Sequence, residues 1–289
     1  MHFIQSKGIL SADHTMNIYR GCLHNCIYCD SRSLCYQMSH DFEDIAIKEN
    51  SIELLENELS HKKRKIMIHT GSMSDPYLCL EKELNYTRRA LEVIATYGFG
   101  ITILTKSDLI LRDIHLLKKI HDSTKCVVQM TIITFDEDLC KTLEPKVCST
   151  KRRFEVLEIL QKEGIPTIVW LSPILPFIND TQENIGKIID ECARVKVYGI
   201  ICFGMGVTLR KGNREYFYNQ LDQLFPGLKE KYMRTYHHQY LALSENHNRL
   251  MSFFHQRCEE KGIVHHNDEL FSYLNQFEQK PKFEQLKLF

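Results

Sequence analysis

The chain has 289 residues, of which 43% are hydrophobic, and its 37 basic residues balance 37 acidic residues to a formal net charge of zero. Such a chain can bury a large core, and its neutrality gives no long-range field that would draw it to nucleic acid or to a membrane surface. It has no run of about 20 apolar residues and does not begin with a basic segment followed by an apolar one, so we expect a cytoplasmic protein without a membrane partner.

Short apolar strands and amphipathic helices alternate along the chain. The apolar runs are rich in β-branched residues and lack polar alternation, which indicates strands buried on both faces. The predicted strands are residues 16–21, 65–70, 100–105, 126–133, 166–172 and 198–204. The predicted helices between them are residues 51–62, 80–98, 111–123, 151–164 and 181–196. This alternation predicts a parallel sheet with helices outside it.

The number of strand–helix units sets the expected architecture. Six units are fewer than the eight of a closed barrel, so we predict an α/β fold, a partial (β/α)6 TIM-like barrel, over residues 1–206. Beyond residue 206 the alternation stops, and residues 214–225 and 247–262 have helical patterns. Residues 207–289 are therefore predicted to form a helical C-terminal region packed on the core.

Eleven cysteines are an odd number, and seven of them lie singly between residues 79 and 258. A disulfide framework belongs to small secreted chains that lack an adequate core, so we expect reduced thiols. Only residues 22–35 group their cysteines, with Cys22, Cys26 and Cys29 spaced Cys-x3-Cys-x2-Cys and Cys35 following. This segment follows the first predicted strand, at the sheet edge where parallel sheets bind ligands.

Two metal centres fit that spacing. Three thiolates can hold three corners of a [4Fe-4S] cluster and leave the fourth iron open to an exogenous ligand. A structural zinc is the alternative, because Cys35, His24 or His40 could complete a tetrahedral site. Zinc modules usually pair their ligands in two short Cys-x2-Cys turns, whereas here both loops share Cys26. The spacing favours iron–sulfur and leaves zinc open.

The residues around the cysteines resemble a known family. The cysteine spacing, with the aromatic Tyr28 before the last cysteine, looks like the signature of the radical S-adenosylmethionine (radical SAM) superfamily. The segments NIYRGCLHNCIYCDSRS, TGSMSDPY, LTKSD and GMGVTLRKGNREYFY resemble more narrowly the spore photoproduct lyase-like subgroup, described as DNA repair photolyases. The resemblance covers most of the chain.

The resemblance implies an enzyme with two cofactors. Cys22, Cys26 and Cys29 would ligate a [4Fe-4S] cluster whose open iron binds S-adenosylmethionine, and Cys35 would not be a ligand. Reductive cleavage of S-adenosylmethionine would give a 5′-deoxyadenosyl radical that abstracts hydrogen from a substrate, as in a lyase, with nucleic acid as the candidate substrate. The electron would come from a donor such as flavodoxin or ferredoxin.

Several further residues follow from the same resemblance. Ser72, Ser74 and Asp75 occupy the loop that would hold the methionine amine, with a helix N-cap and turn as the alternative. Lys106 matches a lysine that meets the methionine carboxylate in that family. A cation suits this position because a buried carboxylate needs a charge-assisted partner. A solvated lysine is the alternative. The remaining predicted cofactor contacts are Thr131 with the ribose, Tyr28 or Ile178 with adenine, and Asn179 after the fifth strand.

The chain departs from the photoproduct lyases at the hydrogen donor. Those enzymes carry a cysteine where this chain has Ser72, and an O–H bond is a much poorer hydrogen donor to a carbon radical than S–H. Tyr77 or Cys79, on the same loop, is therefore the predicted catalytic donor.

A basic segment follows the last predicted strand. Arg210, Lys211 and Arg214 are predicted to bind phosphates or another anionic substrate, with internal pairing to Glu215 as the alternative. A second class of function also fits the sequence: a non-catalytic zinc or iron–sulfur protein that binds nucleic acid and uses the cysteines structurally.

Overall fold

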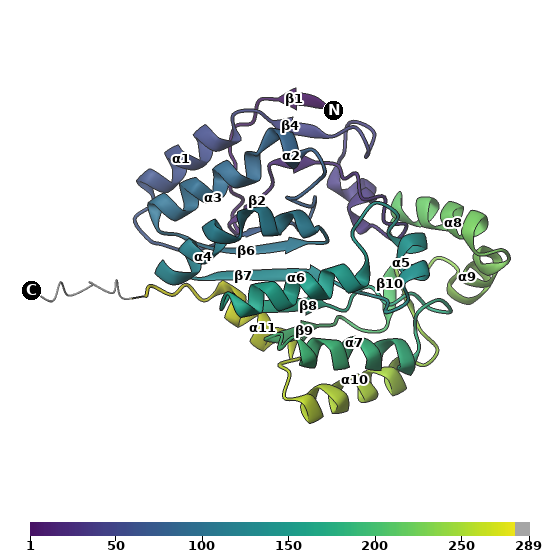
Figure 1. Cartoon of the computed structure of the whole chain (residues 1–289). Helices are drawn as coiled ribbons and strands as arrows, with labels where there is room; N and C mark the ends of the chain where they lie inside the picture. The colour runs from purple at the N-terminus through teal and green to yellow at the C-terminus, as the bar shows by residue number, and fades with distance from the viewer. Residues whose placement is uncertain (281–289) are drawn as a thin grey trace, which may run out of the picture.

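A parallel sheet of six strands forms the centre of the computed structural model, which describes residues 1–280 (Figure 1). Its order is β2-β5-β6-β7-β8-β9, and every neighbouring pair is parallel. The strands are β2 (Thr15–Met16), β5 (Met67–Thr70), β6 (Gly100–Thr105), β7 (Cys126–Thr131), β8 (Thr167–Trp170) and β9 (Gly199–Ile201). The predicted α/β partial barrel is thereby confirmed.

The strands are buried on both faces, as their composition predicts. All six residues of β7 are buried. Val128 and Met130 pack into the main core with the crossover helices, whereas Val127, on the opposite face, packs with Leu270 and Leu274 of the C-terminal region. Each face of the strand therefore needs an apolar side chain, which explains why the sequence shows no polar alternation.

Five long helices connect these strands on the outer side (Figure 1). They are α1 (Ser51–His61), α3 (Tyr86–Tyr97), α4 (Ile114–Ser123), α6 (Thr150–Lys162) and α7 (Gln182–Arg194). The helix predicted over residues 80–98 is broken into α2 (Glu81–Leu84) and α3, because Asn85 adopts a left-handed conformation and caps α2 through its backbone N–H. Shorter helices that were not predicted are η1 (Asp30–Arg32), η2 (Leu34–Tyr36), η3 (Asp108–Asp113) and α5 (Glu137–Leu143).

The first predicted strand, residues 16–21, is wrong as a single element. Met16 belongs to β2 of the large sheet, whereas β3 (Tyr19–Arg20) joins a second sheet with β1 (His2–Ile4) and β4 (Ala46–Lys48). The physical reason is the burial pattern: Ile18 and Tyr19 are consecutive and both buried, so the chain changes face between them.

The C-terminal region combines helices with a hairpin. It contains β10 (Gly206–Thr208), α8 (Asn213–Leu224), α9 (Leu228–Tyr236), β11 (Leu241–Leu243), α10 (His247–Lys261) and α11 (Asn267–Asn275). α10 packs on α7 and α11 on β9, while α8, α9 and the β10–β11 hairpin share an apolar cluster with residues 26–28. The division after residue 206 stays a prediction, and all three apolar clusters of the described residues cross it.

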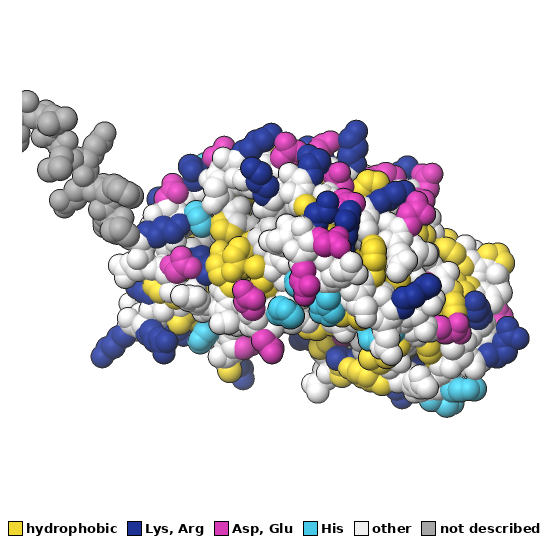
Figure 2. Space-filling view, turned by 90° about the horizontal axis from the view of Figure 1, so that it is seen from below, with side chains coloured by type: hydrophobic (Ala, Val, Ile, Leu, Met, Phe, Trp, Pro, Cys, Tyr) yellow, Lys and Arg dark blue, Asp and Glu magenta, His cyan; other side chains and the backbone are white. Residues whose placement is uncertain are grey.

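The surface reflects the balanced charge of the chain. Basic and acidic side chains are interspersed over the face seen in Figure 2. None of the helices within residues 1–280 combines the length and apolar character that crossing a membrane requires.

Candidate active site

Three cysteines and one lysine line a common cavity at the carboxyl ends of β5, β6 and β7. Cys22, Cys26 and Cys29 border a space of about 110 Å³ together with Lys106. Its other walls include Gly71, Ser72, Ser74, Asp75, Leu104 and Thr131. Eight of the residues predicted to bind the metal centre or its cofactor thus line this cavity. Tyr28 also borders it and is the ninth. Their ligand roles stay predictions.

The thiols surround this cavity without meeting at one point. Within residues 1–280, no three His, Cys, Asp or Glu side chains gather closely enough to hold a metal ion. Sulfurs that share one tetrahedral zinc lie only about 3.8 Å apart, since each Zn–S bond is about 2.3 Å long. An iron–sulfur cube spreads its ligands over a larger volume than a single zinc ion does.

Burial sets the charge state of these groups. Burial raises the pKa of Cys22 to about 12 and that of Cys26 well above the ordinary thiol value. Burial acts to lower the pKa of Lys106, but the neighbouring Cys26, Glu144 and Cys29 outweigh it and raise the pKa. Lys106 therefore carries a positive charge into a cavity where the thiols must lose protons to bind metal.

Backbone contacts hold the cysteine loop against three other parts of the chain. The N–H of Cys22 donates to the carbonyl of Phe42 (3.1 Å), and the N–H of Ile27 donates to the carbonyl of Leu143 (3.0 Å). The hydroxyl of Ser74 donates to the carbonyl of Gly21 (2.6 Å). The predicted cofactor residue Ser74 thus also braces the loop.

A buried ion pair that the sequence did not predict stabilises the cysteine loop. Arg153 Nη2 lies 2.5 Å from Glu144 Oε2, and both side chains are almost completely buried. The Tyr28 hydroxyl donates to Glu144, and Arg153 Nη1 donates to the carbonyl of Thr131 (2.8 Å). The ring of Tyr28 borders the cavity, and Lys106 Nζ lies 5.9 Å from its centroid. The contacts through Glu144 and Arg153 therefore connect the cysteine motif to the end of β7.

The loop after β5 passes very close to β6. Gly71 has φ +101°, and a Cβ there would lie 1.8 Å from the carbonyl oxygen of Leu104. The Asp75 carboxylate accepts from Thr105 Oγ1 (2.7 Å) and from the N–H groups of Tyr77 (2.8 Å) and Lys106 (2.7 Å). This is the turn geometry that the sequence offered as the alternative, although Asp75 also borders the cavity.

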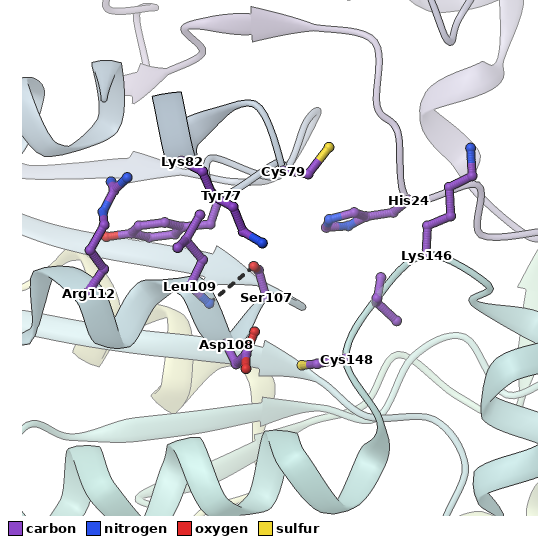
Figure 3. A pocket seen from close by; sticks show the side chains of 11 residues that line it. His24, Tyr77, Cys79, Lys82, Ser107, Asp108, Leu109, Arg112, Lys146 and Cys148 are labelled. Atoms are coloured by element: carbon purple, nitrogen blue, oxygen red, sulfur yellow. Dashed lines mark hydrogen bonds between the residues drawn. The ribbon is translucent and has the colours of Figure 1, made fainter. Parts of the chain in front are cut away.

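His24 separates this cavity from a second, larger one (Figure 3). Its Nδ1 lies 3.5 Å from Asp75 Oδ2, and burial lowers its pKa. The predicted hydrogen donors Tyr77 and Cys79 line the second cavity and not the cysteine cavity. Tyr77 is buried and its hydroxyl has no hydrogen-bond partner within residues 1–280, whereas Cys79 is exposed.

Two predicted adenine-side residues lie away from the thiols. Ile178 and Asn179 border a separate hollow next to Thr134 and Asn184. Asn179 is buried, accepts from the N–H of Leu175 (2.6 Å) and donates to a carbonyl after β7 (2.8 Å), so it braces two loops.

The predicted substrate-binding arginines are engaged by protein groups. Arg210 donates to Tyr36 Oη (2.8 Å) and contacts Asp30 (3.3 Å), and Arg214 donates to the carbonyl of Gln239 (2.6 Å). Lys211 has no ion pair within the described part of the chain. Cys35 is exposed, lies 3.6 Å from Arg210 Nη1 and does not border the cysteine cavity.

The fold and the site define a class of protein: an α/β partial barrel with three thiols and a lysine at the carboxyl edge of its sheet. The chain belongs to the Radical SAM superfamily, whose family model matches residues 16–192. It is therefore an enzyme of that superfamily.

Curated proteins match the chain in sequence, and a solved structure matches it in fold. Uncharacterized protein MJ0683 of Methanocaldococcus jannaschii is 36% identical over 64% of this chain and 69% of its own length. Uncharacterized protein Rv2578c of Mycobacterium tuberculosis is 26% identical over 81% of this chain and 70% of its own. A cysteine-to-alanine variant of spore photoproduct lyase superposes with a TM-score of 0.65 at 14% identity, over 90% of this chain and 78% of that one. The lyase fold therefore matches the subgroup that the sequence resembles.

Proposed function

We propose that Cys22, Cys26 and Cys29 hold a [4Fe-4S] cluster and that the cavity beside them receives S-adenosylmethionine. The observation that carries the proposal is the shared cavity, in which three thiols face one lysine at the carboxyl ends of three parallel strands. Together, the cluster and S-adenosylmethionine supply a carbon radical that can abstract hydrogen from a substrate. A solved spore photoproduct lyase variant carries bound AdoMet, which supports the same cofactor here.

This chain's own residues contribute position and charge. The ammonium of Lys106 offers a charge-assisted partner for a carboxylate in this cavity. The Glu144–Arg153 pair fixes Tyr28 and the end of β7, so the thiols and Thr131 keep their relative positions. Because such a site is already ordered, little of the free energy of cofactor binding is lost in ordering its loops.

The non-catalytic zinc alternative has less support. The thiols do not converge on one point within residues 1–280, and Cys35 is outside the cavity. His40 is half-buried and its Nδ1 lies 3.0 Å from a backbone carbonyl oxygen.

The residues of the site point to the cofactors and do not identify one substrate or one electron donor. A nucleic-acid substrate, a lyase reaction in DNA repair and a flavodoxin or ferredoxin partner remain proposals that rest on the resemblance. Because Arg210 and Arg214 are bound by protein groups, a phosphate at this segment would have to displace those contacts. Tyr77 or Cys79 could return hydrogen only to a substrate that reaches the second cavity.

Anaerobic reconstitution with iron and sulfide tests the proposal. We expect a brown protein with about four iron atoms per chain, whose reduced spectrum in electron paramagnetic resonance shifts when S-adenosylmethionine is added. With dithionite it should then release 5′-deoxyadenosine. A colourless protein with stoichiometric zinc, or a cluster that is insensitive to S-adenosylmethionine, would contradict the proposal.

A further inference from the structure

The second cavity is large enough for a small molecule and adjoins the proposed cofactor site. It has a volume of about 380 Å³, within the range of small-molecule pockets. Loops after β5, β6 and β7 and the cysteine loop supply its walls (Figure 3). His24 borders both cavities, and Cys148 Sγ lies 3.1 Å from the carbonyl oxygen of Lys106, whose side chain borders the cofactor cavity.

The cavity carries an excess of positive charge. Its one carboxylate, Asp108, is paired with Arg152 (2.9 Å). Its one arginine, Arg112, is likewise neutralised by the buried Asp113 (2.8 Å) and Glu81 (3.2 Å). Two further lining residues, Lys82 and Lys146, form no ion pair with any residue in 1–280. The unpaired lysines therefore leave about two positive charges for a ligand.

Polar groups point into this space from several sides. Lys82 and His24 extend into it from opposite walls, and Ser107 lies beneath the end of Lys82 (Figure 3). Ser107 Oγ accepts from the N–H of Leu109 (3.3 Å), so its own proton remains available for a ligand. Lys146 lies on the far side of His24, with its ammonium directed away from Lys82 and Ser107 (Figure 3), and its flexible four-carbon stem allows it to turn toward a ligand.

We propose that this second cavity binds a small phosphate monoester and that this molecule is the substrate. A phosphate monoester carries about 1.5 to 2 negative charges at neutral pH, which matches two unpaired lysines. A phosphodiester of a nucleic-acid backbone carries one negative charge per phosphate and matches less well. Lysine binds phosphate as a point charge, and the Ser107 hydroxyl adds a neutral donor. The assignment rests on the proposed function, because only the adjoining cofactor site makes this ligand a substrate.

Calorimetric titration of the full-length reconstituted protein tests the assignment, with ribose 5-phosphate and ribose as probes. Ribose 5-phosphate should bind at least about tenfold more tightly than ribose, and Lys82→Gln and Lys146→Gln should each remove about tenfold of that affinity. Lys63→Gln is the matched control, since Lys63 is exposed and precedes β5 at the opposite end of the strand. It should bind like the wild type.

A chemical readout confirms the location. Cys79 is exposed at this cavity, so bound ribose 5-phosphate should slow its alkylation by iodoacetamide, measured on its peptide by mass spectrometry, at least about threefold at a saturating concentration. Unprotected Cys79 would overturn the proposal. So would equal affinity for ribose, tighter binding of a dinucleotide phosphodiester or of inorganic phosphate, or a Lys82 variant that binds like the Lys63 variant.

The two proposals fail separately. Titrations are performed without S-adenosylmethionine and repeated on protein without iron, so they do not depend on turnover. Release of 5′-deoxyadenosine without phosphate-ester binding would overturn only the substrate assignment. Binding without that release would contradict the proposed function and leave a phosphate-ester site with no substrate role.

Discussion

Cys22 and Cys35 belong to the same loop but have opposite surroundings, which gives a direct test at the scale of single residues. Cys22 is buried at the cavity, whereas Cys35 is exposed beside Arg210. We expect Cys22→Ser to bind iron and sulfide at least about tenfold more weakly, because it removes a ligand. Cys35→Ser should keep wild-type iron content, measured colorimetrically after reconstitution, and loss of iron from this variant would refute the three-ligand site.

Among residues 1–280, Lys106 is the one lysine or arginine that lines the cavity with the thiols. Removing its charge by Lys106→Gln should weaken S-adenosylmethionine binding by about tenfold while the cluster still assembles. Equilibrium dialysis against labelled S-adenosylmethionine measures the affinity, and iron analysis checks the cluster. The control is Lys118→Gln, an exposed lysine on α4. Equal affinity in both variants would mean that Lys106 has only a structural role.

At the scale of elements, the Glu144–Arg153 pair makes stability depend on pH. Burial acts to raise the pKa of Glu144, but Arg153, Lys106 and the Tyr28 hydroxyl outweigh it and lower the pKa below its ordinary value. The ionised carboxylate therefore stabilises the fold above the unfolded-state pKa of about 4.3, and this stabilisation is lost as the pH falls through the lower folded-state pKa.

The substitution Glu144→Gln isolates this effect. At pH 7 it leaves Arg153 buried without its partner, so we expect the free energy of unfolding to fall by about 3–5 kcal/mol. The difference from wild type should shrink as the pH falls below about 4 and on through the lowered folded-state pKa of Glu144, because the carboxyl then becomes neutral like the glutamine. Urea unfolding at a series of pH values measures it. Glu183→Gln, whose exposed partner is Lys187, serves as control and should change little at any pH.

The close approach of the β5 loop to β6 gives a second prediction for elements. Gly71→Ala forces a Cβ against the Leu104 carbonyl and needs a left-handed backbone, so it should destabilise the protein by more than about 1 kcal/mol and disturb iron uptake. Gly8→Ala meets no atom within 4 Å and should stay within about 0.5 kcal/mol of wild type. Thermal unfolding compares the two, and similar melting temperatures would contradict the tight contact.

The same elements show what the sequence could predict. Strands such as β7 were predictable because burial on both faces demands an unbroken apolar run. The two-residue strands β2 and β3 were not, because so short a segment has no periodicity of its own. The grouping of the three thiols around one cavity was predictable from their spacing, although their role as ligands stays a prediction. The Tyr28–Glu144 contact joins residues 116 positions apart and leaves no local pattern.

At the scale of the whole molecule, the C-terminal region packs against the cysteine loop. Phe217 of α8 is buried in one apolar cluster with Cys26, Ile27 and Tyr28 of the cysteine motif. The ring of Tyr216 also lies 3.8 Å from the Arg32 guanidinium, which follows that motif. The cysteine loop therefore depends on packing supplied by residues nearly two hundred positions further along the chain.

Two matched phenylalanines test this coupling. Phe217 on α8 and Phe254 on α10 are both fully buried, but Phe217 shares its apolar cluster with residues 26–28, whereas Phe254 belongs to the main core on a helix that packs on α7. Each change to alanine should cost about 3–5 kcal/mol of unfolding free energy. Under native conditions, amide hydrogen exchange in the peptide spanning residues 22–30 should then be faster in Phe217→Ala than in wild type, because the loop opens locally, and unchanged in Phe254→Ala. Phe217→Ala should also retain iron more weakly. If both variants protect that peptide equally, the cysteine loop is held by the barrel alone and the C-terminal region has no part in the site.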